Sequence, residues 1–136
     1  MKKLTEEERR EQGIIKDPTD DIGEMSGPYP YTEAEVEARI VDTKASGNYR
    51  TGVINEKGAF IPKYVGRGVV YDRLKKHLDE GFSDTHFKFT YEADEIRSYE
   101  MESAGYHYFK KQLRNDIHPR KPDGMEDKIT CPYCGN

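Results

Sequence analysis

The chain has 136 residues, 35% charged and 34% hydrophobic, which is enough for one domain with a small core but not for two. No run of about 18 apolar residues occurs, and the N-terminus lacks an apolar stretch, so we expect neither a membrane span nor a secretory signal. Both cysteines lie within the last six residues, which excludes a disulfide framework and favours a reducing, cytoplasmic setting.

The net charge of −4 is unevenly distributed along the chain. Residues 1–37 hold eleven acidic and five basic side chains, whereas residues 38–136 hold fifteen acidic and seventeen basic ones. The acidity therefore belongs to the N-terminal part. The mildly basic remainder is compatible with a polyanionic partner.

Residues 1–30 are expected to form an acidic, flexible N-terminal tail. Residues 4–12 predict one or two polar helical turns, and residues 16–30 contain Pro, Gly and Asp without periodicity. We assign residues 31–115 to the folded domain and residues 116–136 to an irregular C-terminal tail.

A helix is predicted to begin after Thr32. Thr32 and Glu35 have the spacing of a capping box, and Val36 and Ile40 give a narrow apolar stripe. The polar, glycine-containing residues 42–47 end this helix.

Two strands at residues 48–55 and 59–65 are expected to form an antiparallel hairpin with Gly58 in its turn. Alternation places every second side chain on one face: Tyr49, Thr51 and Val53 in the first strand, and Phe60, Pro62 and Tyr64 in the second. Because Pro62 has no backbone N–H, its stretch is expected at a sheet edge or a bulge.

A second helix is predicted over residues 70–81. It is closed by Gly81 and carries Val70, Leu74 and Leu78 on one face. The basic residues of this helix lie at its other positions.

Residues 86–93 alternate in polarity and predict a third strand with Phe87, Phe89 and Tyr91 inward. A long helix is predicted from about Asp94 to about Arg114. The expected fold class is α+β, with a small antiparallel sheet of about three strands flanked by helices.

This order of elements, together with four motifs, resembles the GIY-YIG nuclease family. The motifs are, in chain order, Gly47-Asn48-Tyr49, Tyr64-Val65-Gly66, the basic helix with Arg73 and His77, and a helical glutamate at Glu100 or Glu102. The resemblance covers roughly residues 45–113. Asn48 departs from the aliphatic residue that the family usually has there, and this departure concerns packing more than chemistry.

The family resemblance implies a divalent-metal-dependent endonuclease, and the residues are consistent with phosphodiester chemistry. The planar fork of an arginine donates two parallel hydrogen bonds to phosphate, a role that we predict for Arg73 with help from Arg67. Lys63 and Lys76 are predicted to add substrate contacts. The alternative interpretation of the basic helix is a solvated charged face.

Tyr49 and Tyr64 stand at strand ends that antiparallel pairing brings together, and either could act as the base. A free tyrosine is mostly neutral at pH 7, so we expect nearby arginines and a metal to lower its pKa. His77 lies four residues after Arg73, on the same helix face, and is predicted to assist.

The helix periodicity distinguishes the two candidate glutamates. Glu102 lies at the margin of an apolar stripe that includes Met101 and Gly105, whereas Glu100 points toward charged neighbours. A carboxylate at an apolar margin is costly unless it is paired or binds a cation. We therefore choose Glu102 as the ligand of Mg²⁺ or Mn²⁺, with Glu100 as the second choice.

Cys131 and Cys134 have the spacing of one zinc knuckle. Zinc takes four ligands, so His118 with another histidine, or the same knuckle of a second copy, would have to complete the site. The alternatives are an ordinary surface position for His118 and a half-lost ribbon or a free, redox-active cysteine pair.

Two hypotheses follow for function. The first is a single-domain endonuclease that hydrolyses DNA, in a phage, homing, restriction or repair context, with RNA left open as substrate. The second is a catalytically weak or inactive nucleic-acid-binding or protein-binding module with the same fold. A homodimer or a targeting partner is expected in either case, because so small a domain has little room to read a long site.

Overall fold

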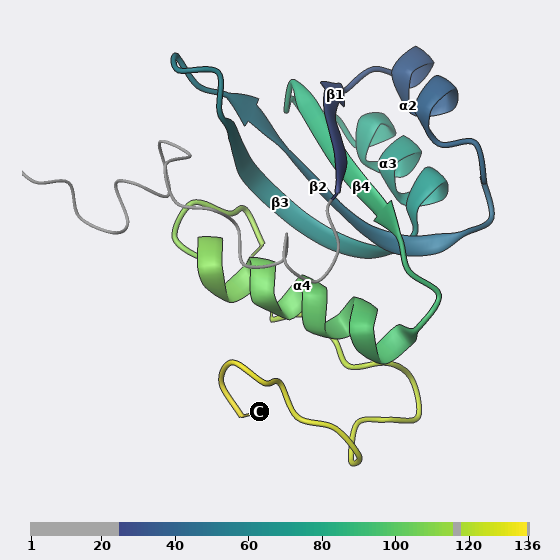
Figure 1. The fold of residues 1–136 in the computed structure, drawn as a ribbon, viewed down its shortest axis with the longest axis vertical. Helices are drawn as coiled ribbons and strands as arrows, with labels where there is room; N and C mark the ends of the chain where they lie inside the picture. Colours follow the sequence, from purple (N-terminus) through teal and green to yellow (C-terminus); the bar gives the residue numbers. More distant parts are fainter. Residues whose placement is uncertain (1–24, 116–117, 136) are drawn as a thin grey trace, which may run out of the picture.

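Four antiparallel strands form the central sheet of the computed structural model, which describes residues 25–115 and 118–135 (Figure 1). The strands are β1 (Ser26–Pro30), β2 (Ser46–Ile54), β3 (Phe60–Val69) and β4 (His86–Tyr91), in the spatial order β1-β4-β2-β3. The α+β class is therefore confirmed, but the expected number of three strands is wrong by one.

The additional strand, β1, comes from the segment that we assigned to the N-terminal tail. It pairs with β4 through Tyr29 opposite Phe87 and Pro30 opposite His86, and the rings of Tyr29 and Phe87 lie 5.6 Å apart. The segment has no strand periodicity of its own, so this strand forms because β4 offers it an open edge. The folded part thus begins before residue 31, and the predicted tail up to residue 24 lies outside the described residues.

β2 and β3 form the predicted hairpin, which is the longest pairing of the sheet. It runs from Ser46 opposite Val69 to Ile54 opposite Phe60, and Gly58 adopts a φ of 82° in the turn. The register shifts opposite Pro62, and β3 is an edge strand of the sheet. Pro62 therefore lies at a bulge and at an edge, where its missing N–H is tolerated.

The first two helices agree with their sequence signals. In α2 (Glu33–Arg39), the Thr32 hydroxyl accepts a hydrogen bond of 3.2 Å from the N–H of Glu35. α3 (Val70–Asp79) is followed by Gly81 with a φ of 91°.

The last helix, α4 (Glu95–Phe109), ends before the predicted position near Arg114. Beyond it, Arg114 donates its backbone N–H to Lys63, and the Asn115 side chain bonds both the N–H and the C=O of Val65. These residues satisfy backbone groups on the open edge of β3. They cannot also continue the helix.

The sheet separates the helices into two layers (Figure 1). α2 and α3 cover one face of the sheet, and α4 crosses the other. Fully buried side chains between α2, α3 and the sheet form the core, including Val36, Ile40, Val70, Leu74 and Phe87. Phe87 and Phe89 point inward as predicted.

Tyr91 is not buried as we expected, since 41% of it is exposed. It is the last residue of β4, and its hydroxyl accepts a hydrogen bond from the N–H of Asp42. Its ring lies 5.5 Å from that of Phe89, so the alternation continues, but the strand ends where helices no longer cover the sheet.

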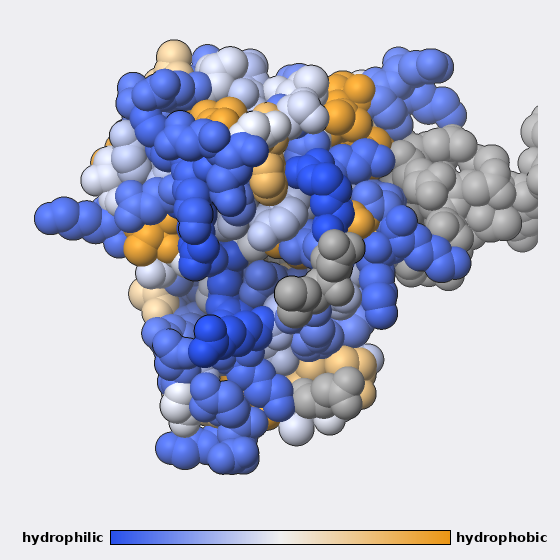
Figure 2. Space-filling view, turned by 180° about the vertical axis from the view of Figure 1, so that it is seen from behind, coloured by the Kyte–Doolittle hydropathy of each residue, from blue (hydrophilic) through white to orange (hydrophobic). Residues whose placement is uncertain are grey.

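Within the described ranges, no helix combines the length and the apolar character needed to cross a bilayer. The face of the molecule seen in Figure 2 is mostly hydrophilic, with small and separated hydrophobic areas. The predicted cytoplasmic setting stays a prediction.

Candidate functional site

A polar pocket of about 430 Å³ opens beside the end of β3. Five of the predicted site residues line it: Tyr49 from β2, Tyr64 and Arg67 from β3, Arg73 from α3 and Glu102 from α4. The structure thus gathers two phenols, two guanidinium groups and one carboxylate from four separate elements.

Glycines in β3 make this gathering sterically feasible. The Tyr49 phenol lies where a side chain of Gly66 would otherwise stand, so any Cβ there would overlap the ring. Gly68 has a φ of 134°, and a Cβ at this position would lie 3.1 Å from Nε of Arg73. Because two glycines leave the β3 edge bare, groups from both faces of the sheet reach the same pocket.

His77 lies behind the pocket wall and contacts Tyr49. The Tyr49 hydroxyl is 2.7 Å from Nε2 of His77, and Nδ1 of His77 is 3.1 Å from the Glu80 carboxylate. A carboxylate only accepts, so the Glu80 contact favours the proton on Nδ1, and Nε2 accepts from the phenol. His77 is 7% exposed, which does not fit the solvated-face alternative for this residue.

Burial dominates the electrostatics of this group. It raises the pKa of Tyr49, with Tyr64 adding to the effect and Arg73 opposing it, and it also raises the pKa of Tyr64. Arg73 acts in the expected direction on both tyrosine pKa values, but desolvation outweighs its charge effect. Burial also lowers the pKa of His77, so its imidazole is neutral near pH 7.

Glu102 forms an ion pair with Arg67 inside the pocket. Nη1 of Arg67 donates to the Glu102 carboxylate at 2.8 Å, and the Glu102 side chain is 13% exposed. Burial raises the pKa of Glu102 to about 7, although Arg67 and Arg73 act to lower it. Glu100 does not line the pocket and lies near Tyr133 instead.

Asn48, the departure from the family pattern, connects β2 to α4. Its side-chain amide donates to the Ser98 carbonyl at 2.8 Å and accepts from the Ser98 hydroxyl at 2.9 Å. Asn48 is 1% exposed, so these bonds form in a dry environment. Ser98 lies one turn before Glu102, and this contact therefore helps to set where Glu102 points.

Charged residues that the sequence analysis did not select also line the pocket. They are Glu92, Glu95, Arg120, Lys121 and Asp123, so the lining carries both signs of charge. Glu92 pairs with Arg97, and Asp123 lies 3.5 Å from Arg120. Within the described part of the chain, Arg73 makes no ion pair and is the cation best placed to receive an anion. For the part of the lining formed by residues 120–123, the neighbouring basic residues Arg120 and Lys121 were the sequence signal.

Two of the predicted substrate contacts do not line the pocket. Lys63 lies on β3 beyond Tyr64, where its charge acts on Asp84 and its carbonyl accepts from Arg114. Lys76 lies in the last turn of α3 and is exposed. Both positions are outside the cluster that the tyrosines and arginines form.

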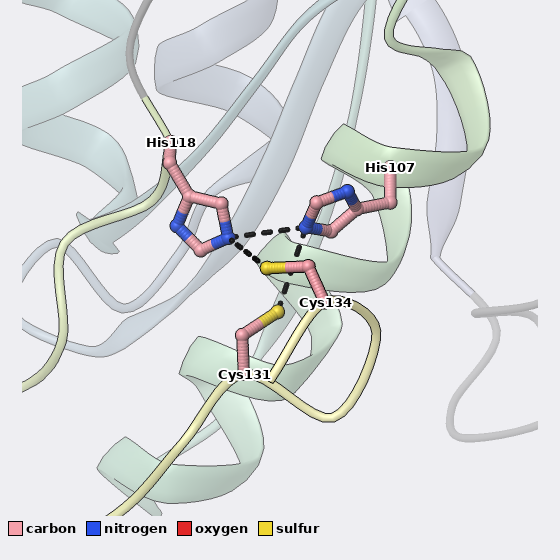
Figure 3. Close-up of side chains that lie close together, drawn as sticks. All are labelled: His107, His118, Cys131 and Cys134. Carbon is pink, nitrogen blue, oxygen red and sulfur yellow. Dashed lines mark hydrogen bonds between the residues drawn. The ribbon is translucent and has the colours of Figure 1, made fainter. Parts of the chain in front are cut away.

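A second constellation lies on α4 and the C-terminal segment (Figure 3). The side chains of His107, His118, Cys131 and Cys134 point toward one another, and their donor atoms all lie within 4.8 Å. Nε2 of His118 is 3.0 Å from Nε2 of His107 and 3.4 Å from Sγ of Cys134, and Sγ of Cys131 is 3.5 Å from Nε2 of His107. This His₂Cys₂ cluster could bind a metal such as zinc.

The donor set and its surroundings fit zinc. Tetrahedral bonds to nitrogen and sulfur place neighbouring donor atoms about 3.3–3.8 Å apart, close to the separations found here. Nδ1 of His118 donates to the Pro119 carbonyl at 2.9 Å, which leaves the lone pair on Nε2 facing the cluster. Burial opposes ionisation of Cys131, but the backbone N–H groups of Tyr133 and Cys134 lower its pKa to about 7.

The histidine that joins His118 is His107, in the last turn of α4. All four donors belong to one chain, so a second copy is not needed to complete the coordination. A Cys-x-x-Cys pair near the end of the chain signals the need for two further ligands, but their positions become evident only in the folded structure.

No family model matches the chain, and no curated protein or solved structure matches it. The GIY-YIG interpretation thus depends on the motifs and on the pocket geometry alone.

Proposed function

We propose that this protein is a divalent-metal-dependent endonuclease of the GIY-YIG type that hydrolyses phosphodiester bonds of DNA. One observation carries the proposal: Tyr49, Tyr64, Arg67, Arg73 and Glu102 meet in one pocket although they are far apart in the sequence. Phosphodiester hydrolysis needs these types of group, because a water must lose a proton while negative charge grows on the phosphoryl oxygens.

Arg73 is the proposed phosphate ligand. It lies at the pocket without an acidic partner among the described residues, and its planar guanidinium group can donate two hydrogen bonds to one phosphate. Arg67 forms an ion pair with Glu102, and its positive charge adds to that of Arg73 in attracting the phosphate. Because Gly66 and Gly68 carry no side chains, the Tyr49 ring and the Arg73 side chain can occupy the space above them at the pocket.

Tyr49 is the proposed proton acceptor, acting through His77. Because the Tyr49 pKa is raised, the phenol keeps its proton at pH 7 and passes it to Nε2 of His77 as it takes one from the attacking water. Glu80 then stabilises the imidazolium ion that forms. The bond from the water oxygen to phosphorus forms while the bond to the leaving sugar oxygen breaks, and solvent returns a proton to that oxygen.

Glu102 is the proposed ligand for Mg²⁺ or Mn²⁺. Its carboxylate faces the pocket, and Mg²⁺ is commonly held by one or two carboxylates together with water and phosphate oxygens. Asp123 and Glu92, which line the same pocket, offer further oxygens nearby. A bound divalent cation would polarise the phosphoryl group and stabilise the leaving oxygen.

A cleavage assay with two neighbouring glutamates tests the proposal. Supercoiled plasmid and single-stranded DNA are incubated with the protein and Mg²⁺ or Mn²⁺, comparing wild type, Glu102→Gln and the matched control Glu100→Gln. We expect cleavage by wild type and by the control, and a loss of about 100-fold or more in Glu102→Gln. Equal activity of Glu102→Gln and wild type would exclude the proposed role of Glu102.

The second candidate is a nucleic-acid-binding module that keeps the pocket but does not cleave. The three basic residues Arg73, Arg120 and Lys121 in the pocket lining would suffice to bind a phosphate backbone, even without catalysis. Tight DNA binding by wild type without cleavage in either metal would select this alternative.

A further inference from the structure

We propose that Zn²⁺ bound by His107, His118, Cys131 and Cys134 fastens residues 119–130 to α4, so that this loop forms a wall of the pocket. The inference concerns how the pocket is built and does not depend on whether DNA is cleaved there.

The loop between His118 and Cys131 makes few contacts of its own that would fix it to the rest of the protein. Residues 119–130 contain turns but no helix or strand, and of these residues only Pro119 and Pro122 are buried. The backbone hydrogen bonds found within it join Met125 to Pro122, and Lys128 and Ile129 to Met125. These bonds shape the loop locally but do not attach it to the rest of the molecule.

A metal at the cluster would supply that attachment. His118 and Cys131 are the residues at the two ends of the loop, and His107 is on α4. One ion that binds all three therefore closes the loop and anchors it to a helix, which restricts the unfolded chain as a cross-link does. Figure 3 shows the two cysteines on the C-terminal segment directed at the two imidazoles.

The anchored loop reaches the pocket. Arg120, Lys121, Pro122 and Asp123 contribute to its lining. The carbonyl of Arg120 accepts a hydrogen bond from Nη2 of Arg67, the same guanidinium group that pairs with Glu102. The loop whose ends carry His118 and Cys131 therefore also contributes to the pocket lining.

Zinc in this site is therefore a structural metal, with four protein ligands and no open position. Its loss would release Arg120 and Lys121 from the pocket, remove a hydrogen bond from Arg67 and leave the sheet intact. A redox-active cysteine pair would leave the histidines without a role and would form a disulfide on oxidation.

Metal analysis combined with hydrogen–deuterium exchange tests the inference. The full chain, expressed with added zinc and purified without chelator, is expected to contain close to one zinc per chain. Removing zinc with a chelator should increase deuterium uptake in residues 119–130 several-fold and leave β2 and β4 unchanged. Less than about a tenth of an equivalent of zinc, or unchanged uptake in residues 119–130 after zinc removal, would overturn it.

Matched histidine and cysteine variants complete the experiment. His118→Gln and Cys134→Ser, the latter at an exposed position, should lose zinc and show the same increase in uptake as the chelated wild type. His86→Gln, which changes a histidine on β4 outside the cluster, should retain both zinc and protection. Retention of full zinc by His118→Gln, or a Cys131–Cys134 disulfide in the metal-free protein as purified, would contradict the proposed ligand set.

Discussion

The sheet with its covering helices and the C-terminal segment are stabilised in different ways. Between the sheet, α2 and α3, large apolar side chains such as Leu74 and Phe87 are fully buried. In residues 118–135, the buried positions are only Pro119, Pro122 and Cys131, and the segment instead brings two cysteines and a histidine to α4. The first region depends on apolar area removed from water, and the second on a few polar donors.

The two regions are therefore sensitive to different kinds of substitution. A packed core responds to lost volume, whereas a segment without a core responds to loss of single ligands. The pocket lies where the two regions meet, since its lining takes Tyr49 and Arg73 from the first and Arg120 from the second. Substitutions in the first region should therefore lower the free energy of unfolding, whereas loss of a ligand in the second should increase hydrogen exchange locally.

The largest effect is expected from Leu74→Ala in the core. Leu74 is fully buried, so the change should lower the free energy of unfolding by about 3 kcal/mol. Leu78→Ala, at a partly buried position on the same helix, should cost clearly less. Urea titration at pH 7 measures both, and an equal cost at the two positions would contradict the core assignment. Zinc content per folded chain should not change.

A smaller effect is expected from Asp84→Asn, which removes a buried carboxylate in the first region. Asp84 accepts two hydrogen bonds of 2.7 Å from Arg114, which follows α4, and one of 2.6 Å from Thr51. Its side chain is 5% exposed, whereas that of Arg114 is 43% exposed and can regain water. We expect a loss of about 2 kcal/mol at pH 7, measured by urea titration.

The pH dependence of the Asp84 effect gives the control. Burial acts to raise the pKa of Asp84, but the hydrogen bonds from Arg114 and Thr51 outweigh it and lower the pKa below its usual value. Stability from a carboxylate with a lowered pKa is present above the unfolded pKa of about 3.9 and is lost as the pH falls through the folded pKa. Wild type and Asp84→Asn should thus converge in acid, while the exposed Asp79→Asn should resemble wild type throughout.

The smallest effect is expected from Glu102→Gln in the pocket, and it should change with pH. With a pKa of about 7 in the folded state, Glu102 binds more protons when folded than when unfolded, so its contribution to stability falls as the pH rises from about 4.5 through 7. Relative to wild type, Glu102→Gln should therefore gain about 1 kcal/mol between pH 6 and pH 8. Urea titration at both pH values measures the gain. A difference independent of pH, as expected for Glu100→Gln, would contradict the raised pKa.

Much of the local structure was predictable because it depends on neighbours in the chain. The Thr32 cap, the turn at Gly58 and the end of α3 at Gly81 follow from backbone chemistry within a few residues. The alternation that placed Phe87 and Phe89 inward depends only on the strand period. The prediction that Tyr91 is buried was wrong because the strand period continues past the part of the sheet that helices cover.

Part of the site was predictable for the same reason. The positions of the strand ends and the helix start predicted that Tyr49, Tyr64 and Arg73 lie close together. Helix periodicity favoured Glu102 over Glu100, and Glu102 lines the pocket. Glu80, the hydrogen-bond partner of His77, has by contrast no distinguishing sequence pattern. Its role depends on the orientation of the His77 ring.

The hairpin, the three helix starts and the cysteine pair could be predicted from the amino-acid sequence, since each is specified by residues that are close in the chain. The three-dimensional fold was needed to show that Ser26–Pro30 forms β1, that α4 ends at Phe109, and that His107 lies beside the two cysteines. The fold was also needed to show that residues 120–123 line the pocket. These features depend on contacts between distant segments, where an open strand edge or a group of converging donor atoms selects its partner by position in space and not by sequence pattern.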